Sequence, residues 1–261
     1  MLNRLAEVES MFGWPDIHGQ KDTTLSISGL NVQYEESLAE ISQLPLSTWR
    51  SQPAGAVYGC SLTYNPEHPV ESWPVASFGH PRYQRFSPFD YFRKPEIDLP
   101  TCDRNDYLDG LGFTHLLPQL KMCPNISAIL NSFRHPVVRA TLRIIDGSKA
   151  HPVIDSEGGM HKDEDPTKLL RVNICLSTNE HFGLQYRNEP PIKMLPGQNL
   201  VVNTDVDHRA WVGAKSPLHR AHIILCLTPW LRRNNRGGWE PNEYFGKIHP
   251  YDMVRNNLVL K

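Results

Sequence analysis

A regular alternation of polar and apolar residues, repeated in short segments between residues 137 and 227, most constrains the fold. In the segment 169–177, every second residue is aliphatic and the residues between are mostly polar. Side chains of an extended strand point to opposite faces in turn, so this pattern predicts strands with one apolar face. We expect strands at 137–145, 169–177, 182–186, 192–195, 199–203 and 219–227. Short strands separated by turns such as Asp146-Gly147 and Pro196-Gly197 are typical of a β-sandwich or barrel.

The polar faces of two predicted strands have an unusual composition. Arg171 and Asn173 lie on the polar face of one strand, and Arg220 and His222 on that of another. Solvated strands more often carry lysine and glutamate. The composition therefore indicates a small polar interior, as in a barrel that holds a site.

The chain is expected to form a single domain over 1–261, in three parts. Residues 1–133 are predicted to be helical and irregular, 134–230 to form the β core, and 231–261 to be a C-terminal tail. The segment 65–110 is rich in proline and aromatic residues. Long irregular insertions in compact domains are usually functional or mobile, so a lid and a surface loop pinned by aromatics are both open interpretations.

Within the N-terminal part, apolar residues recur at helical spacing in some segments and alternate in others. We expect helices at 1–13, 35–43 and 112–133, and strands at 25–34 and 55–64. Pro124 should divide the last helical segment, and Asn125 is a suitable cap for its second piece.

Composition excludes several classes of protein. The 27 basic and 28 acidic residues nearly cancel, so no broad basic field is available for general nucleic-acid binding. No run of eighteen apolar residues is present, and the first ten residues lack a signal-peptide hydrophobic region, so neither membrane insertion nor secretion is expected. The five cysteines are scattered and lack a Cys-x-x-Cys motif, which is typical of free thiols in a reducing compartment. We expect a cytoplasmic protein.

His161 and Asp163 are two residues apart, so they point the same way if the backbone between them is extended. His208 follows a predicted strand 45 residues after Asp163 and can supply a third ligand at the same mouth of a small barrel. Two histidines and one carboxylate on one face, with three open positions, form the facial triad of non-heme Fe(II) oxygenases. His-x-Asp alone is common by chance, and zinc or manganese in an isomerase or hydrolase would use the same donors.

Arg220 lies on the polar face of the last predicted strand, twelve residues after His208. A guanidinium binds a carboxylate through two parallel hydrogen bonds, which lysine cannot reproduce. Arg171 is placed in the same way on its own strand and is a second candidate for a carboxylate of a co-substrate or substrate.

Several segments together resemble the 2-oxoglutarate-dependent Fe(II) dioxygenases, within the aspartyl/asparaginyl β-hydroxylase and bacterial proline cis-hydroxylase group. They are Val138–Arg143 with Asp146-Gly147, His161-Lys-Asp163, Leu170–Leu176, Pro196–Asn203, Asp207–Trp211 and His219–Leu227. The resemblance implies a double-stranded β-helix, a jelly-roll and cupin-like core. It also implies His161, Asp163 and His208 as ligands of Fe(II), with Arg220 holding the distal carboxylate of 2-oxoglutarate and Arg171 near the oxo acid and the substrate. Asn173 stands at a position where some members of the group have histidine, so the contact made by that histidine is not expected here.

The activity implied is hydroxylation of an unactivated C–H bond of a small, amino-acid-like substrate, with 2-oxoglutarate and dioxygen consumed. Three alternatives stay open. They are a hydroxylase of peptidyl side chains, a non-catalytic binding module of the same fold, and the metal-dependent isomerase or hydrolase.

Overall fold

A computed structural model describes residues 24–48, 56–76, 113–150, 160–163, 170–228, 230–233, 235, 239–245 and 247–261. The predicted helix at 1–13 and residues 77–110 of the predicted lid lie outside the described residues.

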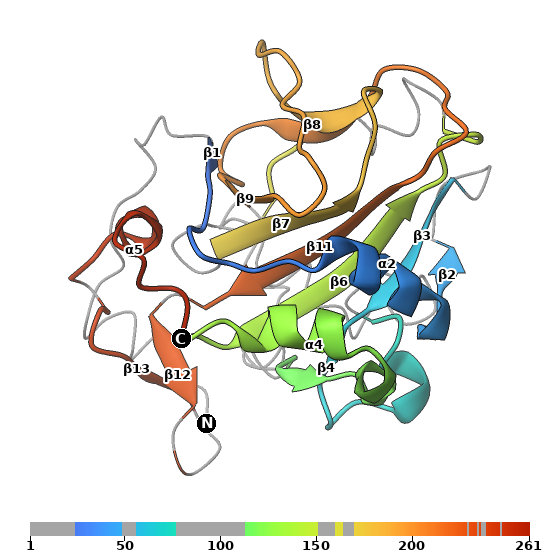
Figure 1. Ribbon diagram of the computed structural model, residues 1–261. Coiled ribbons are helices and arrows are strands. Elements are labelled where there is room, and N and C mark those ends of the chain that lie inside the picture. Colours follow the sequence, from blue (N-terminus) through green and yellow to red (C-terminus); the bar gives the residue numbers. More distant parts are fainter. Residues whose placement is uncertain are drawn as a thin grey trace, which may run out of the picture.

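The centre of the molecule is a seven-stranded sheet in the order β1-β9-β7-β11-β6-β3-β2, in which every neighbouring pair is antiparallel (Figure 1). Its strands are β1 Thr24–Leu25, β2 Ser47–Thr48, β3 Val57–Ser61, β6 Val137–Ile145, β7 Leu170–Ser177, β9 Asn199–Val202 and β11 Arg220–Leu227. The long strands β6, β7 and β11 lie side by side in the middle, where both of their faces are covered. The prediction of a mainly β protein is confirmed.

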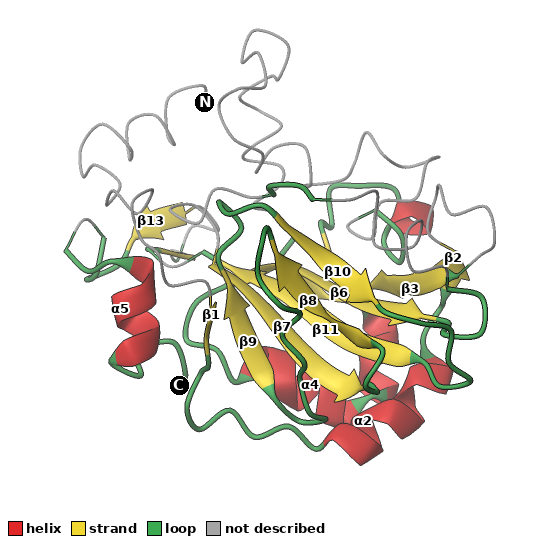
Figure 2. Cartoon of the chain, turned by 90° about the horizontal axis from the view of Figure 1, so that it is seen from above, coloured by secondary structure: helices red, strands yellow, loops and turns green. Residues whose placement is uncertain are grey.

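Helices α2 (Tyr34–Glu40) and α4 (Pro124–Asn131) cover one face of this sheet (Figures 1 and 2). Alternate residues of β6, β7 and β11 join the apolar stripe of α4 in one continuous core, which includes Ile126, Val172 and Ile223. Each fully buried aliphatic side chain stabilises the fold by roughly 1.5 to 3 kcal/mol, so this face supplies much of the stability.

A small antiparallel sheet of β8 (Phe182–Tyr186) and β10 (His208–Val212) lies over the opposite face (Figure 1). Leu184 and Tyr186 of β8 form a second apolar cluster with Cys175, Leu200 and Val202 of the large sheet. A large and a small sheet facing one another are what a double-stranded β-helix requires. The described residues place only β8 and β10 in the small sheet, so the complete jelly roll stays a prediction.

The predicted strands at 137–145, 169–177, 182–186, 199–203 and 219–227 are confirmed to within one residue at each end. At the predicted Pro196-Gly197 turn, Gly197 has a φ of +82°, a conformation that glycine adopts readily. The expectation for 192–195 is wrong, because only Ile192 pairs there, through a single bridge to Leu184.

The segment 25–34 is not the expected strand beyond Leu25. The backbone of Ile27 bonds instead to the side chain of Asn199, whose Oδ1 accepts from Ile27 N at 2.6 Å and whose Nδ2 donates to Ile27 O at 3.1 Å. The chain then turns at Gly29, which has a φ of +84°. A side chain has replaced the neighbouring strand as hydrogen-bond partner, and sequence alternation carries no sign of that exchange.

A largely helical N-terminal part is not shown. Between residues 24 and 133 the described elements other than α2 and α4 are short strands and 3₁₀ turns. They include β4 Thr63–Tyr64, β5 His115–Leu116 and the 3₁₀ segments Ile41–Gln43, Val70–Ser72 and Pro118–Met122. Helix formation at 112–133 is therefore confined to α4 and the turn before it.

The cap of α4 also differs from the prediction. Asn125 lies inside the helix, and the carboxylate of Glu40 accepts hydrogen bonds from the backbone N–H groups of Asn125 and Ile126 at 2.8 and 2.9 Å. Glu40 is nearly buried and comes from α2, 85 residues earlier in the chain. A carboxylate satisfies the unpaired N–H groups and favours the positive end of a helix, so Glu40 does what a local cap would do.

The C-terminal residues are more than a tail. Strands β12 (Leu231–Arg233) and β13 (Trp239–Pro241) form a hairpin, and helix α5 (Pro250–Arg255) follows. Tyr251, Met253 and Val259 join the main core under the large sheet. None of the helices in the described ranges has both the length and the hydropathy needed to cross a bilayer.

Candidate metal centre

His161 and His208 meet through an isolated antiparallel bridge between their backbones. His161 N donates to His208 O at 3.0 Å, and His208 N donates to His161 O at 2.9 Å. Two residues further on, Asp163 N donates to Thr204 O at 3.1 Å. The extended backbone at 161–163 turns both side chains toward His208, which is the first residue of β10.

The three side chains converge on one point. One ligand atom from each residue lies within 4.8 Å of the other two. Asp163 Oδ2 is 3.5 Å from His161 Nε2 and 3.5 Å from His208 Nε2. Asp163 and His208 are buried, whereas the side chain of His161 is 31% exposed and forms the open side of the cluster.

The orientation of His208 is fixed by its second ring nitrogen. Nδ1 lies 2.9 Å from the carbonyl oxygen of Val206. A carbonyl oxygen can only accept a hydrogen bond, so Nδ1 carries the proton and donates it. Nε2 is then left with its lone pair directed at Asp163 Oδ2 and at the centre of the cluster. A neutral imidazole whose other nitrogen donates to a carbonyl is the usual form of a metal-binding histidine.

Arg171 supplies the positive charge next to Asp163. Its Nη1 is in direct contact with Asp163 Oδ2 and lies 3.5 Å from His208 Nε2. Burial by itself would raise the pKa of Asp163, but the charge of Arg171 and the hydrogen bond from His161 hold that pKa well below its usual value. Asp163 is therefore a carboxylate at neutral pH, and its lone pairs face a cation.

The three donors fit a divalent metal ion. Atoms that each lie about 2.0 to 2.2 Å from one ion are roughly 3 Å apart when they occupy adjacent corners, so the 3.5 Å separations need only a small contraction. The lone pairs of Asp163 and His208 already face one cationic nitrogen, Arg171 Nη1. An ion bound by the same Oδ2 would require that nitrogen to withdraw.

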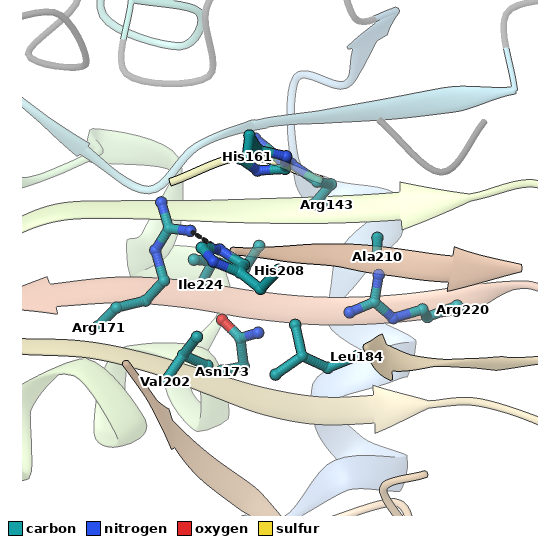
Figure 3. Close-up of a pocket in the computed structure, with 10 residues that line it drawn as sticks. All are labelled: Arg143, His161, Arg171, Asn173, Leu184, Val202, His208, Ala210, Arg220 and Ile224. Carbon is teal, nitrogen blue, oxygen red and sulfur yellow. Dashed lines mark hydrogen bonds between the residues drawn. The ribbon is translucent and has the colours of Figure 1, made fainter. Parts of the chain in front are cut away.

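A pocket opens beside this cluster, between the large sheet and the β8–β10 sheet (Figure 3). Its polar lining holds basic and amide side chains together with the two histidines, and its apolar lining is aliphatic. The lining residues are Arg143, His161, Arg171, Asn173, Leu184, Val202, His208, Ala210, Arg220 and Ile224.

Arg220 lies in the same pocket as the histidines, as the sequence led us to expect, and only 4% of it is exposed. Its Nε donates to His222 Nε2 at 3.3 Å, and Nη2 lies 3.0 Å from His222 Nδ1. Burial, with Arg220 beside it, lowers the pKa of His222 well below its usual value, so the imidazole is neutral and adds no charge against the guanidinium.

Two polar lining residues were not among the site residues predicted from the sequence. Arg143 of β6 is paired across the sheet with His222, and Asn173 of β7 is paired with Ile224. Both lie on polar faces that the alternation predicts. The alternation gives the face of a residue but not its position along the sheet, so it could not tell them from residues away from the pocket.

No protein-family model and no curated protein sequence matches the chain. Among solved structures, an oxidoreductase of the 2OG-Fe(II) oxygenase family from Burkholderia pseudomallei is similar, with 14% identity, a TM-score of 0.40, and coverage of 86% of this chain and 90% of that one. The non-heme alpha ketoglutarate dependent carbocyclase SnoK from nogalamycin biosynthesis has 11% identity, a TM-score of 0.39 and 80% coverage of both chains. The epimerase SnoN from the same biosynthesis, also described as non-heme and alpha ketoglutarate dependent, has 10% identity, a TM-score of 0.40 and coverage of 88% and 84%. Similarity of this extent does not assign a function to the chain.

Proposed function

We propose that this protein is a 2-oxoglutarate-dependent Fe(II) oxygenase in which His161, Asp163 and His208 hold the iron. The observation that carries the proposal is the convergence of these three side chains beside a pocket that also contains a buried arginine, Arg220. Two histidines and one carboxylate suit Fe(II) and leave positions open for other ligands. Zinc accepts the same donors, so Arg220 in the pocket is what favours an oxygenase over a hydrolase.

The residues would divide the work as follows. His161, Asp163 and His208 bind and orient the metal, and Arg220 binds the distal carboxylate of the oxo acid through parallel hydrogen bonds. The neutral ring of His222 holds the guanidinium in place. When bound, Fe(II) supplies the activation of dioxygen. Leu184, Val202 and Ile224 give the pocket apolar walls, which exclude water from the reacting atoms.

Arg171 has a different contact from the one that its position in the sequence suggests. Its guanidinium binds Asp163, so in this state it neutralises the ligand carboxylate. Arg171 Nη1 would have to leave Asp163 Oδ2 if that oxygen held a metal ion. We propose that it then turns to a carboxylate of the oxo acid or of the substrate.

The reaction we favour is hydroxylation of an unactivated C–H bond of a small, amino-acid-like substrate, as in the aspartyl/asparaginyl and proline hydroxylase group. Support for a small acidic substrate comes from Arg143 and Arg171, which line the same pocket in addition to Arg220. A peptidyl side chain is the main alternative substrate.

We further propose that the chain forms one domain with its β core over 134–230, and that the protein is located in the cytoplasm.

The test is formation of succinate from 2-oxoglutarate by the purified protein, with Fe(II) added or withheld. We expect turnover that requires Fe(II) and is abolished in His161→Ala. His181→Ala is the matched control, because His181 is also partly exposed but pairs with Glu180 and does not line the pocket. Metal analysis and an anaerobic titration with 2-oxoglutarate separate the alternatives. Tightly bound zinc with no response to the oxo acid would overturn the proposal in favour of a hydrolase.

A further inference from the structure

One polar side chain of the pocket, that of Asn173, takes no part in the contacts described above. Asn173 is 95% buried, being only 5% exposed. Within the part of the chain that the structure describes, its Oδ1 is enclosed and has no hydrogen-bond partner. A buried carboxamide without partners is costly, so a residue of this kind is normally kept only where something else completes its hydrogen bonds.

The neighbouring strands explain why the described part of the chain offers the Asn173 carboxamide no partner. Across the sheet, Asn173 is paired with Ile224 of β11 on one side and with Leu200 of β9 on the other. Leu184 of β8 also lines the pocket and lies beside Asn173 in Figure 3. These three side chains are aliphatic, so the carboxamide is surrounded by groups that neither donate nor accept.

The pocket is the direction that stays open. In Figure 3 the Asn173 side chain points into the space between His208 and Arg171 on one side and Arg220 on the other. A ligand that reaches from the metal ligands to Arg220 must therefore pass the carboxamide. On the proposed function that ligand is 2-oxoglutarate, with its keto-acid end at the metal and its far carboxylate at Arg220.

We propose that Asn173 is a binding residue for the oxo acid, donating a hydrogen bond from Nδ2 to one of its carboxylate oxygens. The ionised oxo acid has only accepting oxygens, so it needs a donor. The carboxamide presents Nδ2 by rotating half a turn about its terminal bond, without any movement of β7. Asn173 thus provides a neutral donor between two guanidinium groups. This inference rests on the proposed function, because it needs the oxo acid to occupy this gap.

The experiment compares wild type with Asn173→Leu and Asn173→Ala. Each protein is loaded with Mn²⁺, which does not support turnover, and titrated with 2-oxoglutarate by calorimetry without oxygen. Both variants should bind the oxo acid about tenfold or more weakly, because a hydrogen bond to a charged group is lost. Their affinity for Mn²⁺ should be unchanged. Asn173→Leu without ligands should be at least as stable as wild type, since it removes a polar group that lacks a partner.

Asn199→Leu is the matched control. Asn199 is also a nearly buried asparagine on a neighbouring strand, but both ends of its carboxamide bond to Ile27. This control should lose stability and keep its affinity for 2-oxoglutarate. Loss of stability in Asn173→Leu to the same degree as in the control, with unchanged oxo-acid affinity, would show a structural role and overturn the proposal.

Two failures can be told apart. If wild type binds Mn²⁺ and 2-oxoglutarate, and both Asn173 variants bind the oxo acid within twofold of wild type, only the role of Asn173 is wrong. If wild type binds no oxo acid, the proposed function and this inference fail together. Should Asn173→Leu not fold, Asn173→Ala, which leaves more space, decides the question by the same titration.

Discussion

The large sheet buries side chains on both of its faces, but the two faces are chemically opposite. Under the helices, Leu142, Val172 and Ile223 are completely buried among other aliphatic side chains. On the other face, Asn173 and Arg220 are also buried, with at most 5% of either exposed. Burial alone therefore does not make an apolar core. The helix side stabilises the fold, and that stability holds costly polar groups in place on the other side, where the candidate site lies.

The largest effect should come from the ion pair on the site face. Arg171→Met leaves the buried carboxylate of Asp163 without its cation and should lower the free energy of unfolding by about 4 kcal/mol, measured in urea without metal ions. Mn²⁺ should recover much of this loss by neutralising Asp163. Arg187→Met is the control, because its pair with Asp207 is exposed and should contribute less than about 1 kcal/mol. Equal losses in both variants would contradict the contrast between buried and exposed pairs.

Exchanging the character of the two faces should have the next largest effect. Val172→Asn places a carboxamide on the helix side, one residue before Asn173, where no ligand can complete its hydrogen bonds. We expect a loss of about 3 kcal/mol, and no loss in Asn173→Leu. Equilibrium unfolding of the two variants checks the comparison. Similar behaviour of both would mean that the two faces do not differ in what they tolerate.

The pH dependence of stability should reveal the buried histidine of the site face. Because the pKa of His222 is lowered on folding, the unfolded chain binds its proton first, and stability is lost as pH falls below about 6.5. One such group costs up to about 2 kcal/mol between pH 6.5 and pH 5. His222→Leu should remove this part of the pH dependence. Burial lowers the pKa of His135, outside the pocket, to about 4, so a second part of similar size should remain. An unchanged pH profile in His222→Leu would show that His222 is not buried as a neutral group.

The smallest effect concerns a charge on the helix side. Glu40→Gln replaces the carboxylate that accepts from Asn125 and Ile126 at the start of α4 with a group that has one acceptor and an unwanted donor. We expect a loss of about 1.5 kcal/mol in urea unfolding, and no change in the affinity for Mn²⁺ or 2-oxoglutarate. A change in ligand affinity would mean that the two faces are more closely coupled than their separate contacts suggest.

The strands could be predicted where their two faces differ in polarity, because apolar and polar residues then alternate along the sequence. Segments 137–145 and 219–227 alternate because one face meets the helices, and they were located almost to the residue. Strand β10 was missed because its faces differ little, since His208, Arg209 and Ala210 give no clear alternation. Its aromatic and β-branched end, Trp211 and Val212 before Gly213, was the available signal.

The cap of α4 and the contact of Arg171 were beyond the sequence for another reason. Glu40 is 85 residues away from Asn125, and local capping rules consider only neighbours. Arg171 was placed on the correct face, but its contact with Asp163 depends on how 160–163 approaches β7. Distances between segments are set by packing, which periodicity does not describe.

By itself, the sequence determined which residues alternate, and hence which side of each strand is polar, because that depends only on the period of an extended backbone. It also supplied three metal-binding side chains and a strand arginine in an order compatible with one site. Only the tertiary structure decided that His161 pairs with His208 across a backbone bridge and that Asp163 meets Arg171. It alone put Asn173 among aliphatic neighbours facing the pocket. Register and sheet stacking bring these groups together, and both are properties of the packed chain.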